Sequence, residues 1–181
     1  DQIREIAEEI GIPVAHKPDS QEICFIPDHD YAKYIRENTD TELPPGNFVD
    51  LDGNIFGKHL GITHYTVGQR KGLNLSMGKP VFVVEIRPET NEVVIGDSKD
   101  VFSDHLTCDH VNWMSVDGLH GETMKVTAKI RYSHKGAPCE IREIGPDLVE
   151  VQFEEPQRAI TPGQAVVFYD GDYVVGGGVI R

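Results

Sequence analysis

Cysteine is scarce in this sequence, basic residues are outnumbered and long apolar runs are missing. Only three of the 181 residues are cysteine, and no two of them form a C-x-x-C pair. A disulfide scaffold and a zinc ribbon are therefore excluded, and a reduced, cytoplasmic setting is favoured. No apolar run approaches the ~20 residues needed to cross a bilayer, and the first residues lack a signal-peptide pattern. Because the chain begins without methionine, we expect a fragment of a longer protein.

The shortage of basic residues is uneven along the chain. Seventeen Lys and Arg against thirty Asp and Glu give a net charge of −13, which taken alone argues against binding nucleic-acid phosphates. Thirteen of these acids lie in residues 1–56, however, whereas residues 57–80 hold no acid and four bases. A weaker basic stretch covers residues 125–142. Local patches of this kind can bind phosphate on an acidic protein, although solvated faces are the commoner explanation.

Helical patterns are confined to the first forty residues. Apolar residues recur at helical spacing over residues 2–11, and Gly11 ends the pattern. Asp28 is suited to cap a second helix that runs to about residue 38. The sequence therefore predicts two short helices separated by a connector.

The remainder reads as strands and tight turns. Hairpins are predicted over residues 48–56 and 81–96, followed by a loop rich in His and Asp. Five or six closely spaced strands after that loop predict a small closed barrel. The expected fold class is mainly β with short α elements (α+β), divided into a central domain over residues 1–103 and a C-terminal β-barrel over residues 104–181. The strands expected in the barrel cover residues 123–132, 138–144, 148–153, 165–169 and 173–180.

Cys24 is the first candidate for chemistry, and its immediate neighbours do not favour it. Its apolar neighbours Ile23 and Phe25 are typical of a buried structural cysteine. A reactive thiol needs nearby positive charge or a helix N-terminus, and Asp19 and Glu22 would oppose thiolate formation. Local chemistry alone therefore favours a packing role.

Two glycine-containing segments are further candidates. Arg70 and Lys71 lie between two glycines in the stretch without acids, which suits phosphate contact and an ordinary exposed turn about equally well. Residues 176–178 are three consecutive glycines without a following Lys-Ser/Thr, so they indicate a bulge or a barrel corner. The histidines have no Cys or carboxylate partners at ligand spacing, and no metal site is predicted.

Three segments taken together resemble one family. They are Asp-Ser-Gln-Glu-Ile-Cys-Phe-Ile at residues 19–26, Gly-Ile-Thr-His-Tyr-Thr-Val-Gly-Gln-Arg-Lys-Gly-Leu at 61–73 and Ile-Thr-Pro-Gly-Gln-Ala at 160–165. Their order and spacing are similar to the C-terminal half of the tRNA-specific 2-thiouridylases, which place sulfur on the wobble uridine of tRNA. The resemblance runs through essentially the whole chain.

The resemblance implies a division of labour in the intact enzyme. Members combine an N-terminal adenylating domain of the PP-loop type, a small central domain and a C-terminal β-barrel similar to those of translation factors. The family binds ATP through an S-G-G-x-D-S loop, which is missing from this sequence. ATP is thus expected as the cofactor of the intact enzyme, bound outside this chain, and the isolated chain is expected to be inactive.

The same resemblance gives Cys24 a role. It matches the second catalytic cysteine, which accepts sulfane sulfur as a persulfide from a sulfur-relay protein. Transfer to C2 of the ATP-activated uridine then leaves a disulfide with the first cysteine, which lies outside this chain. A persulfide is more acidic and more nucleophilic than a thiol, so Cys24 need not be strongly activated itself.

The resemblance also predicts the contacts with tRNA. Arg131, Tyr132 and Gln164 match barrel positions that touch tRNA, and Arg70 and Lys71 are expected to contact its backbone. The expected partners are tRNA and a sulfur-relay protein, with no membrane, and the protein is expected to be a monomer.

Two alternatives remain open at this stage. A non-catalytic RNA-binding module would use the barrel and the basic loop, residues 68–73, to dock tRNA, and it would have no need of Cys24. A cysteine hydrolase would pair Cys24 with a histidine, but no oxyanion site or oriented triad can be named for it.

Overall fold

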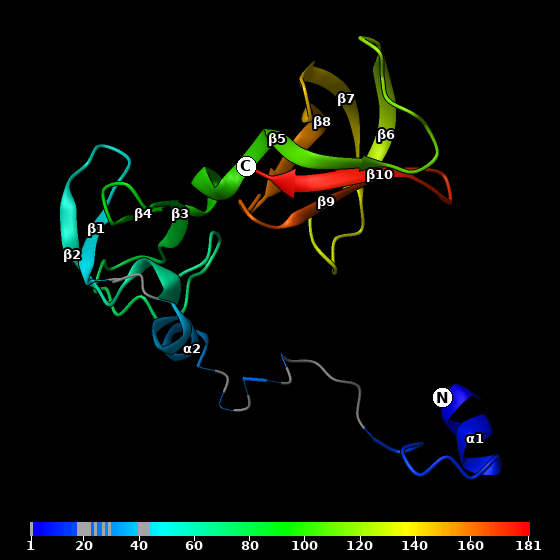
Figure 1. Cartoon of the computed structure of the whole chain (residues 1–181). Helices are drawn as coiled ribbons and strands as arrows, with labels where there is room; N and C mark the ends of the chain where they lie inside the picture. Colours follow the sequence, from blue (N-terminus) through cyan, green and yellow to red (C-terminus); the bar gives the residue numbers. More distant parts are fainter. Residues whose placement is uncertain (1, 18–22, 24, 27, 29, 40–43) are drawn as a thin grey trace. The chain divides into compact units, whose positions relative to one another are not determined.

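The computed structural model describes residues 2–17, 23, 25–26, 28, 30–39 and 44–181 (Figure 1). The chain divides into two compact units, Asp1–Glu42 and Leu43–Arg181. Most of the regular structure of these residues is β, with two α-helices and a closed barrel, so the predicted α+β class is confirmed. No helix in the described part of the chain is long and apolar enough to cross a membrane.

The first unit contains the two predicted helices, α1 (Gln2–Glu9) and α2 (Tyr31–Asn38). The N-cap of α2 is Asp30, whose carboxylate accepts a 2.9 Å hydrogen bond from the backbone N–H of Lys33. The prediction of Asp28 as the cap was wrong, because the helix begins at Tyr31 and the residue directly before it, Asp30, supplies the capping carboxylate. Asp28 instead accepts a 3.1 Å hydrogen bond from the Lys33 ammonium.

The second unit begins with a four-stranded sheet in the order β2-β1-β4-β3. The strands are β1 (Gly46–Val49), β2 (Ile55–His59), β3 (Phe82–Arg87) and β4 (Glu92–Gly96). Both predicted hairpins are confirmed as antiparallel pairs, and β1 joins them by pairing in parallel with β4. The core of this sheet is formed by Phe48, Tyr65, Leu73, Val81, Val83, Val93 and Ile95.

The remaining strands close into a barrel in the order β10-β5-β8-β7-β6-β9, which confirms the predicted barrel (Figure 1). Buried and exposed positions alternate along β7, with Ala137, Cys139 and Ile141 facing the core. This period of two fills the interior with apolar side chains and leaves the polar ones outside. The strands are β5 (Phe102–Trp113), β6 (Thr123–Lys129), β7 (Ala137–Gly145), β8 (Leu148–Arg158), β9 (Ala165–Asp170) and β10 (Tyr173–Ile180).

The prediction of a His- and Asp-rich loop before the barrel was wrong, because most of this segment forms β5, the longest strand. Leu106 and Cys108 point into the core with 4% and 0% of their surface exposed. His105 and the neighbouring polar residues occupy the alternate positions, which hid the apolar face from inspection of the sequence. β5 pairs with β8 on one side and β10 on the other, and these pairings close the barrel.

The three consecutive glycines lie in β10, as predicted, and the register of the strand shifts between Val174 and Gly176 against β9 and between Gly177 and Val179 against β5. A Cβ atom at Gly177 would lie 2.5 Å from the Val166 carbonyl oxygen, and one at Gly178 would lie 2.6 Å from the Asp109 oxygen. Neighbouring backbones approach β10 too closely for any side chain here. These glycines therefore serve barrel closure.

Candidate nucleic-acid interface

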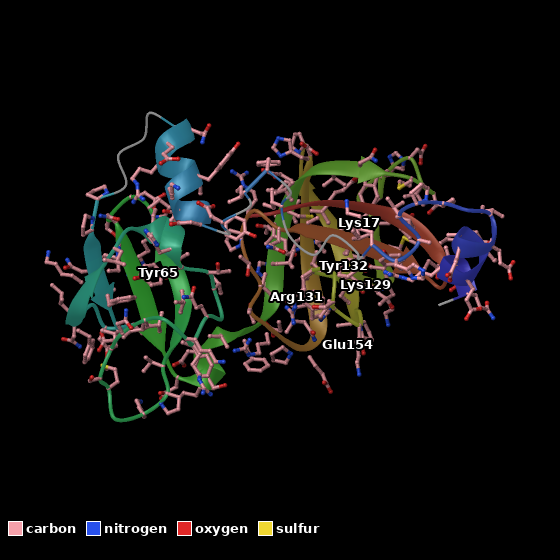
Figure 2. The ribbon with its side chains drawn as sticks, turned by 90° about the horizontal axis from the view of Figure 1, so that it is seen from below. Lys17, Tyr65, Lys129, Arg131, Tyr132 and Glu154 are labelled. Atoms are coloured by element: carbon pink, nitrogen blue, oxygen red, sulfur yellow. The ribbon has the colours of Figure 1, made fainter. Side chains whose placement is uncertain are left out.

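A pocket of about 360 Å³ opens on the outer face of the barrel where β6 and β9 pair. The predicted residues Arg131, Tyr132 and Gln164 all line it, although more than thirty positions separate Gln164 from the other two. Figure 2 shows Arg131 and Tyr132 together with Lys129, which also lines this pocket. The fold thus brings three of the six predicted site residues into one place.

Hydrogen bonds hold two of these three residues, Arg131 and Gln164, in place. The Arg131 guanidinium donates a 2.9 Å hydrogen bond to the Arg158 carbonyl oxygen. Gln164 follows a turn closed by its own N–H to the Thr161 oxygen at 3.2 Å, and its carbonyl accepts from the Ile180 N–H at 2.8 Å. Tyr132 is fully exposed, as an aromatic ring must be to stack on a base.

Two lining residues with polar groups, Lys129 and Tyr169, were missed by the sequence analysis. The Lys129 ammonium lies 5.3 Å from the centre of the Tyr169 ring, in a cation–π arrangement that holds the charge beside the pocket. Lys129 could have been found from the sequence, because it lies two positions before Arg131 and so shares its side of an extended chain. Tyr169 comes from a strand distant in sequence, which no local pattern indicated.

The chemistry of this pocket suits an anionic, aromatic ligand. Its lining offers two positive charges, two phenol rings and one amide, and none of its residues is acidic. Guanidinium and ammonium groups bind phosphate oxygens, while tyrosine rings stack on bases without strong sequence preference. This combination of groups is compatible with single-stranded or looped RNA.

Arg70 and Lys71 lie elsewhere, on an exposed loop beside the four-stranded sheet. The loop backbone is held at Gly68, whose N–H donates to the Val83 oxygen at 2.8 Å, and at Gln69, whose carbonyl accepts from the Val83 N–H at 2.9 Å. The Gln69 side chain also bridges the loop by donating to the Lys71 oxygen at 3.0 Å. In the part of the chain that the structure describes, neither Arg70 nor Lys71 forms an ion pair.

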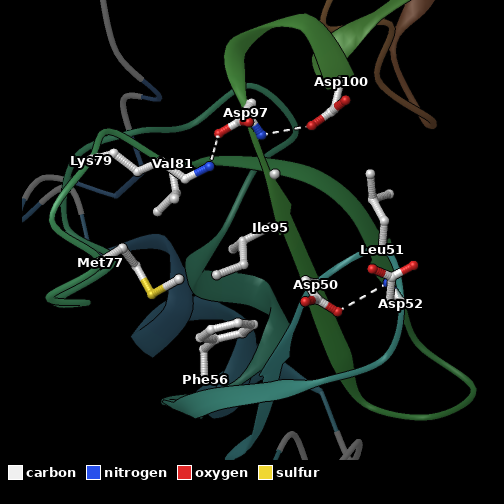
Figure 3. A pocket seen from close by; sticks show the side chains of 11 residues that line it. Asp50, Leu51, Asp52, Phe56, Met77, Lys79, Val81, Ile95, Asp97 and Asp100 are labelled. Carbon is white, nitrogen blue, oxygen red and sulfur yellow. Dashed lines mark hydrogen bonds and ion pairs between the residues drawn. The ribbon is translucent and has the colours of Figure 1, made fainter.

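A second pocket, of about 290 Å³, lies on the four-stranded sheet and has the opposite charge (Figure 3). Four aspartates and one lysine line it around an apolar floor. The Lys79 ammonium, 2.6 Å from Asp97, lowers the pKa of that carboxyl, and hydrogen bonds from Asn54 lower the pKa of Asp50. Because these carboxylates are ionised at neutral pH, this pocket would repel an RNA backbone.

Cys24, the candidate for sulfur chemistry, lies outside the described residues. Its sequence neighbours Phe25 and Ile26 line a small pocket with Asp28, Lys33 and others, and the Phe25 ring lies 5.4 Å from that of Tyr34. The Lys33 ammonium there is neutralised by Asp28.

The other two cysteines, Cys108 and Cys139, are inside the barrel. Cys108 and Cys139 are 0% and 3% exposed, and burial raises the pKa of each thiol to about 12. Both are therefore protonated at neutral pH and unsuited to nucleophilic chemistry. Among the residues the structure describes, no group of three or more His, Cys, Asp or Glu side chains could hold a metal ion.

Three family models match successive parts of the chain. The tRNA methyl transferase HUP domain matches residues 1–28, the tRNA methyl transferase PRC-barrel domain matches residues 32–97, and the aminomethyltransferase beta-barrel domain matches residues 103–180. The first match includes the position of Cys24. The division into residues 1–103 and 104–181 stays a prediction.

Curated relatives are similar over essentially the whole chain. The chain is 58% identical to tRNA-specific 2-thiouridylases of Lachnoclostridium phytofermentans and Acetivibrio thermocellus, and 53% identical to that of Clostridioides difficile. These matches cover 99–100% of this chain and 50% of each relative, so the chain spans about half the length of the relatives it matches. The chain belongs to the tRNA-specific 2-thiouridylase family, of whose members it represents the C-terminal half.

Proposed function

We propose that this chain is the sulfur-carrying and tRNA-docking part of an enzyme that converts the wobble uridine of tRNA to 2-thiouridine. The observation that carries the proposal is the segment around Cys24, in a chain 58% identical to proteins named for that reaction. The barrel pocket adds independent support, because its two basic side chains, two tyrosine rings and one amide suit RNA.

Cys24 is proposed to carry the sulfur. A sulfur-relay protein would load it as a persulfide, whose terminal sulfur attacks C2 of the uridine. ATP supplies the activation, since an adenylated O2 leaves as AMP when the C2–S bond forms. A second cysteine, outside this chain, would then attack the persulfide and release the thiolated base, leaving a disulfide to be reduced. A reducing cytoplasm would serve that last step.

The barrel and the basic loop are proposed to hold the tRNA. Arg131 and Lys129 would neutralise phosphates, Tyr132 would stack on an exposed base, and Gln164 would hydrogen-bond a base edge or ribose. Arg70 and Lys71 would contact the backbone from their loop. Phosphate contacts of this kind fix the orientation of the RNA without reading its sequence.

The test uses the full-length enzyme with Cys24→Ser. Enzyme, tRNA, ATP and a sulfur donor are incubated, and 2-thiouridine is quantified by nucleoside mass spectrometry. We expect product to be lost while tRNA affinity stays unchanged. Cys139→Ser is the matched control, because serine retains a donor to the Val126 oxygen that the thiol contacts at 3.6 Å, and this variant should make normal product.

The competing function is a non-catalytic RNA-binding module, for which the barrel pocket alone would suffice. Unchanged 2-thiouridine in Cys24→Ser would remove Cys24 from the sulfur path and leave docking as the role of this half. Loss of both product and tRNA binding would instead point to misfolding, which thermal melting of the variant would reveal.

A further inference from the structure

Arg158, which neither the sequence motifs nor the pocket lining include, connects the two proposed tRNA-contacting regions. It is the last residue of β8 and pairs with Phe102, where the barrel meets the chain from the four-stranded sheet. The next residue, Ala159, donates its N–H to the Val101 oxygen at 2.7 Å. The backbone at Arg158 is therefore fixed to the barrel.

The side chain of Arg158 reaches the start of the basic loop. Its guanidinium donates a 3.3 Å hydrogen bond to the Gly68 carbonyl oxygen and lies 5.5 Å from the centre of the Phe82 ring. Gly68 is tightly enclosed on this side, because a Cβ atom there would lie 2.7 Å from the Ala159 Cβ. Arg158 thus contacts both the loop and the strand that the loop packs against.

The backbone of Arg158 reaches the barrel pocket as well. Its carbonyl oxygen accepts the 2.9 Å hydrogen bond from Arg131, a residue that lines that pocket. One residue therefore links Arg131 on the barrel to the loop that presents Arg70 and Lys71.

We propose that Arg158 is a positioning residue that holds the basic loop, residues 68–73, in a fixed relation to the barrel pocket, so that one tRNA engages both. The proposal rests on the proposed function. When two contact regions are held at the correct spacing, binding at one raises the effective concentration at the other. A loop that moved freely would lose this gain even with Arg70 and Lys71 intact.

The chemistry explains why arginine occupies this position. A planar guanidinium stacks on an aromatic ring and donates in its plane at the same time, whereas an ammonium is a point charge that does not do both equally well. Arg158→Lys therefore keeps the charge and loses the geometry. Arg158→Ala removes both but leaves the backbone oxygen that anchors Arg131.

The test measures tRNA affinity of the full-length enzyme in a double-mutant cycle. Arg70→Gln, Arg158→Ala, Arg158→Lys and the two double variants are compared with the wild type. We expect Arg158→Ala to weaken tRNA binding about tenfold. The fold-loss of affinity caused by Arg70→Gln should be at least about threefold smaller in the Arg158→Ala background than in the wild type, as for residues coupled in one network. Arg142→Ala, a barrel arginine paired with Glu150, is the matched control and should not couple to Arg70→Gln.

Several outcomes overturn the inference, and they are distinct from failure of the proposed function. Additive effects of Arg158→Ala and Arg70→Gln would show that Arg158 does not position the loop. Wild-type tRNA affinity in Arg158→Lys would mean that only the charge of Arg158 matters and that its guanidinium geometry does not. If Arg70→Gln alone leaves tRNA affinity unchanged, the proposed role of the loop fails, and the inference fails with it.

A readout without tRNA tests the physical step by itself. In Arg158→Ala, amide exchange over residues 66–73 should accelerate, while the strands of the barrel keep their protection and the melting temperature changes little. Unchanged exchange in the loop would overturn the inference whatever tRNA affinity shows.

Discussion

The thiols of Cys108 and Cys139 are inert for a local reason: each points into the apolar barrel core, where a thiolate would have no compensating charge. Burial raises the pKa of both to about 12. We predict that iodoacetamide at pH 8 leaves both unmodified in the native protein and alkylates both in urea, as measured by peptide mass spectrometry. Modification of either residue without denaturant would contradict the assignment of these cysteines to the core.

His59 makes stability depend on pH in one direction. Its ring is 1% exposed, Nδ1 accepts a 3.0 Å hydrogen bond from the Gly61 N–H, and Nε2 lies 3.1 Å from the Asn91 oxygen. This arrangement holds a neutral ring with the proton on Nε2, and desolvation lowers the His59 pKa below its ordinary value of 6.5. The unfolded chain therefore takes up the proton first, and stability should fall as pH drops below 6.5.

The measurement is urea unfolding at pH 7 and pH 5 for the wild type and His59→Gln. We expect the variant to be less stable at pH 7 but to lose less stability on going to pH 5. His110 and His120 act in the opposite direction, because Asp109 and Asp117 raise their pKa values, and comparison with the variant cancels their effect. An equal pH dependence in both proteins would show that His59 does not contribute.

β10 can close the barrel only without side chains at its centre. A Cβ atom at Gly177 would overlap the Val166 carbonyl of the neighbouring strand at 2.5 Å. We predict that Gly177→Ala lowers the free energy of unfolding by about 1–3 kcal/mol, the usual cost of overpacking. Gly145→Ala is the control, because its Cβ would meet only Leu148 at an ordinary 3.8 Å. Similar stabilities of the two variants in urea titration would contradict this account.

The elements that the sequence predicted well are those with a local signal. Period-two patterns and turn residues identified both hairpins and the strands after residue 123, and the triple glycine was assigned to a strand for steric reasons. β5 was missed because His105, Asp109 and other polar residues occupy its outward positions. The barrel pocket was predicted only in part, since Tyr169 reaches it through the pairing of β9 with β6, which no local pattern encodes.

Among the described residues, all ten strands and both apolar cores lie between residues 46 and 180, so we expect the second unit to fold by itself. We predict that a protein of residues 43–181 unfolds cooperatively, with a urea midpoint close to that of the whole chain. Trp113, the single tryptophan, packs against Phe168 in the barrel and reports the transition by fluorescence. A broad transition with an exposed tryptophan in the absence of denaturant would refute the prediction.

The whole chain carries a net charge of −13, so the proposed binding of a polyanion requires attraction from a few locally concentrated basic residues. Each phosphate contact releases a counterion and adds about 0.7–0.9 to the slope of log affinity against log salt. For the full-length enzyme, Arg131→Gln should therefore lower the magnitude of that slope by about 0.7–0.9.

Tyr132→Leu should weaken tRNA binding by about 1–3 kcal/mol without changing the slope, because stacking releases no counterion. Arg87→Gln, which removes an arginine paired with Glu85, should leave both quantities unchanged. A slope that fell equally in Arg131→Gln and Tyr132→Leu would mean that Tyr132 acts by orienting the charged groups, and the stacking role would be lost.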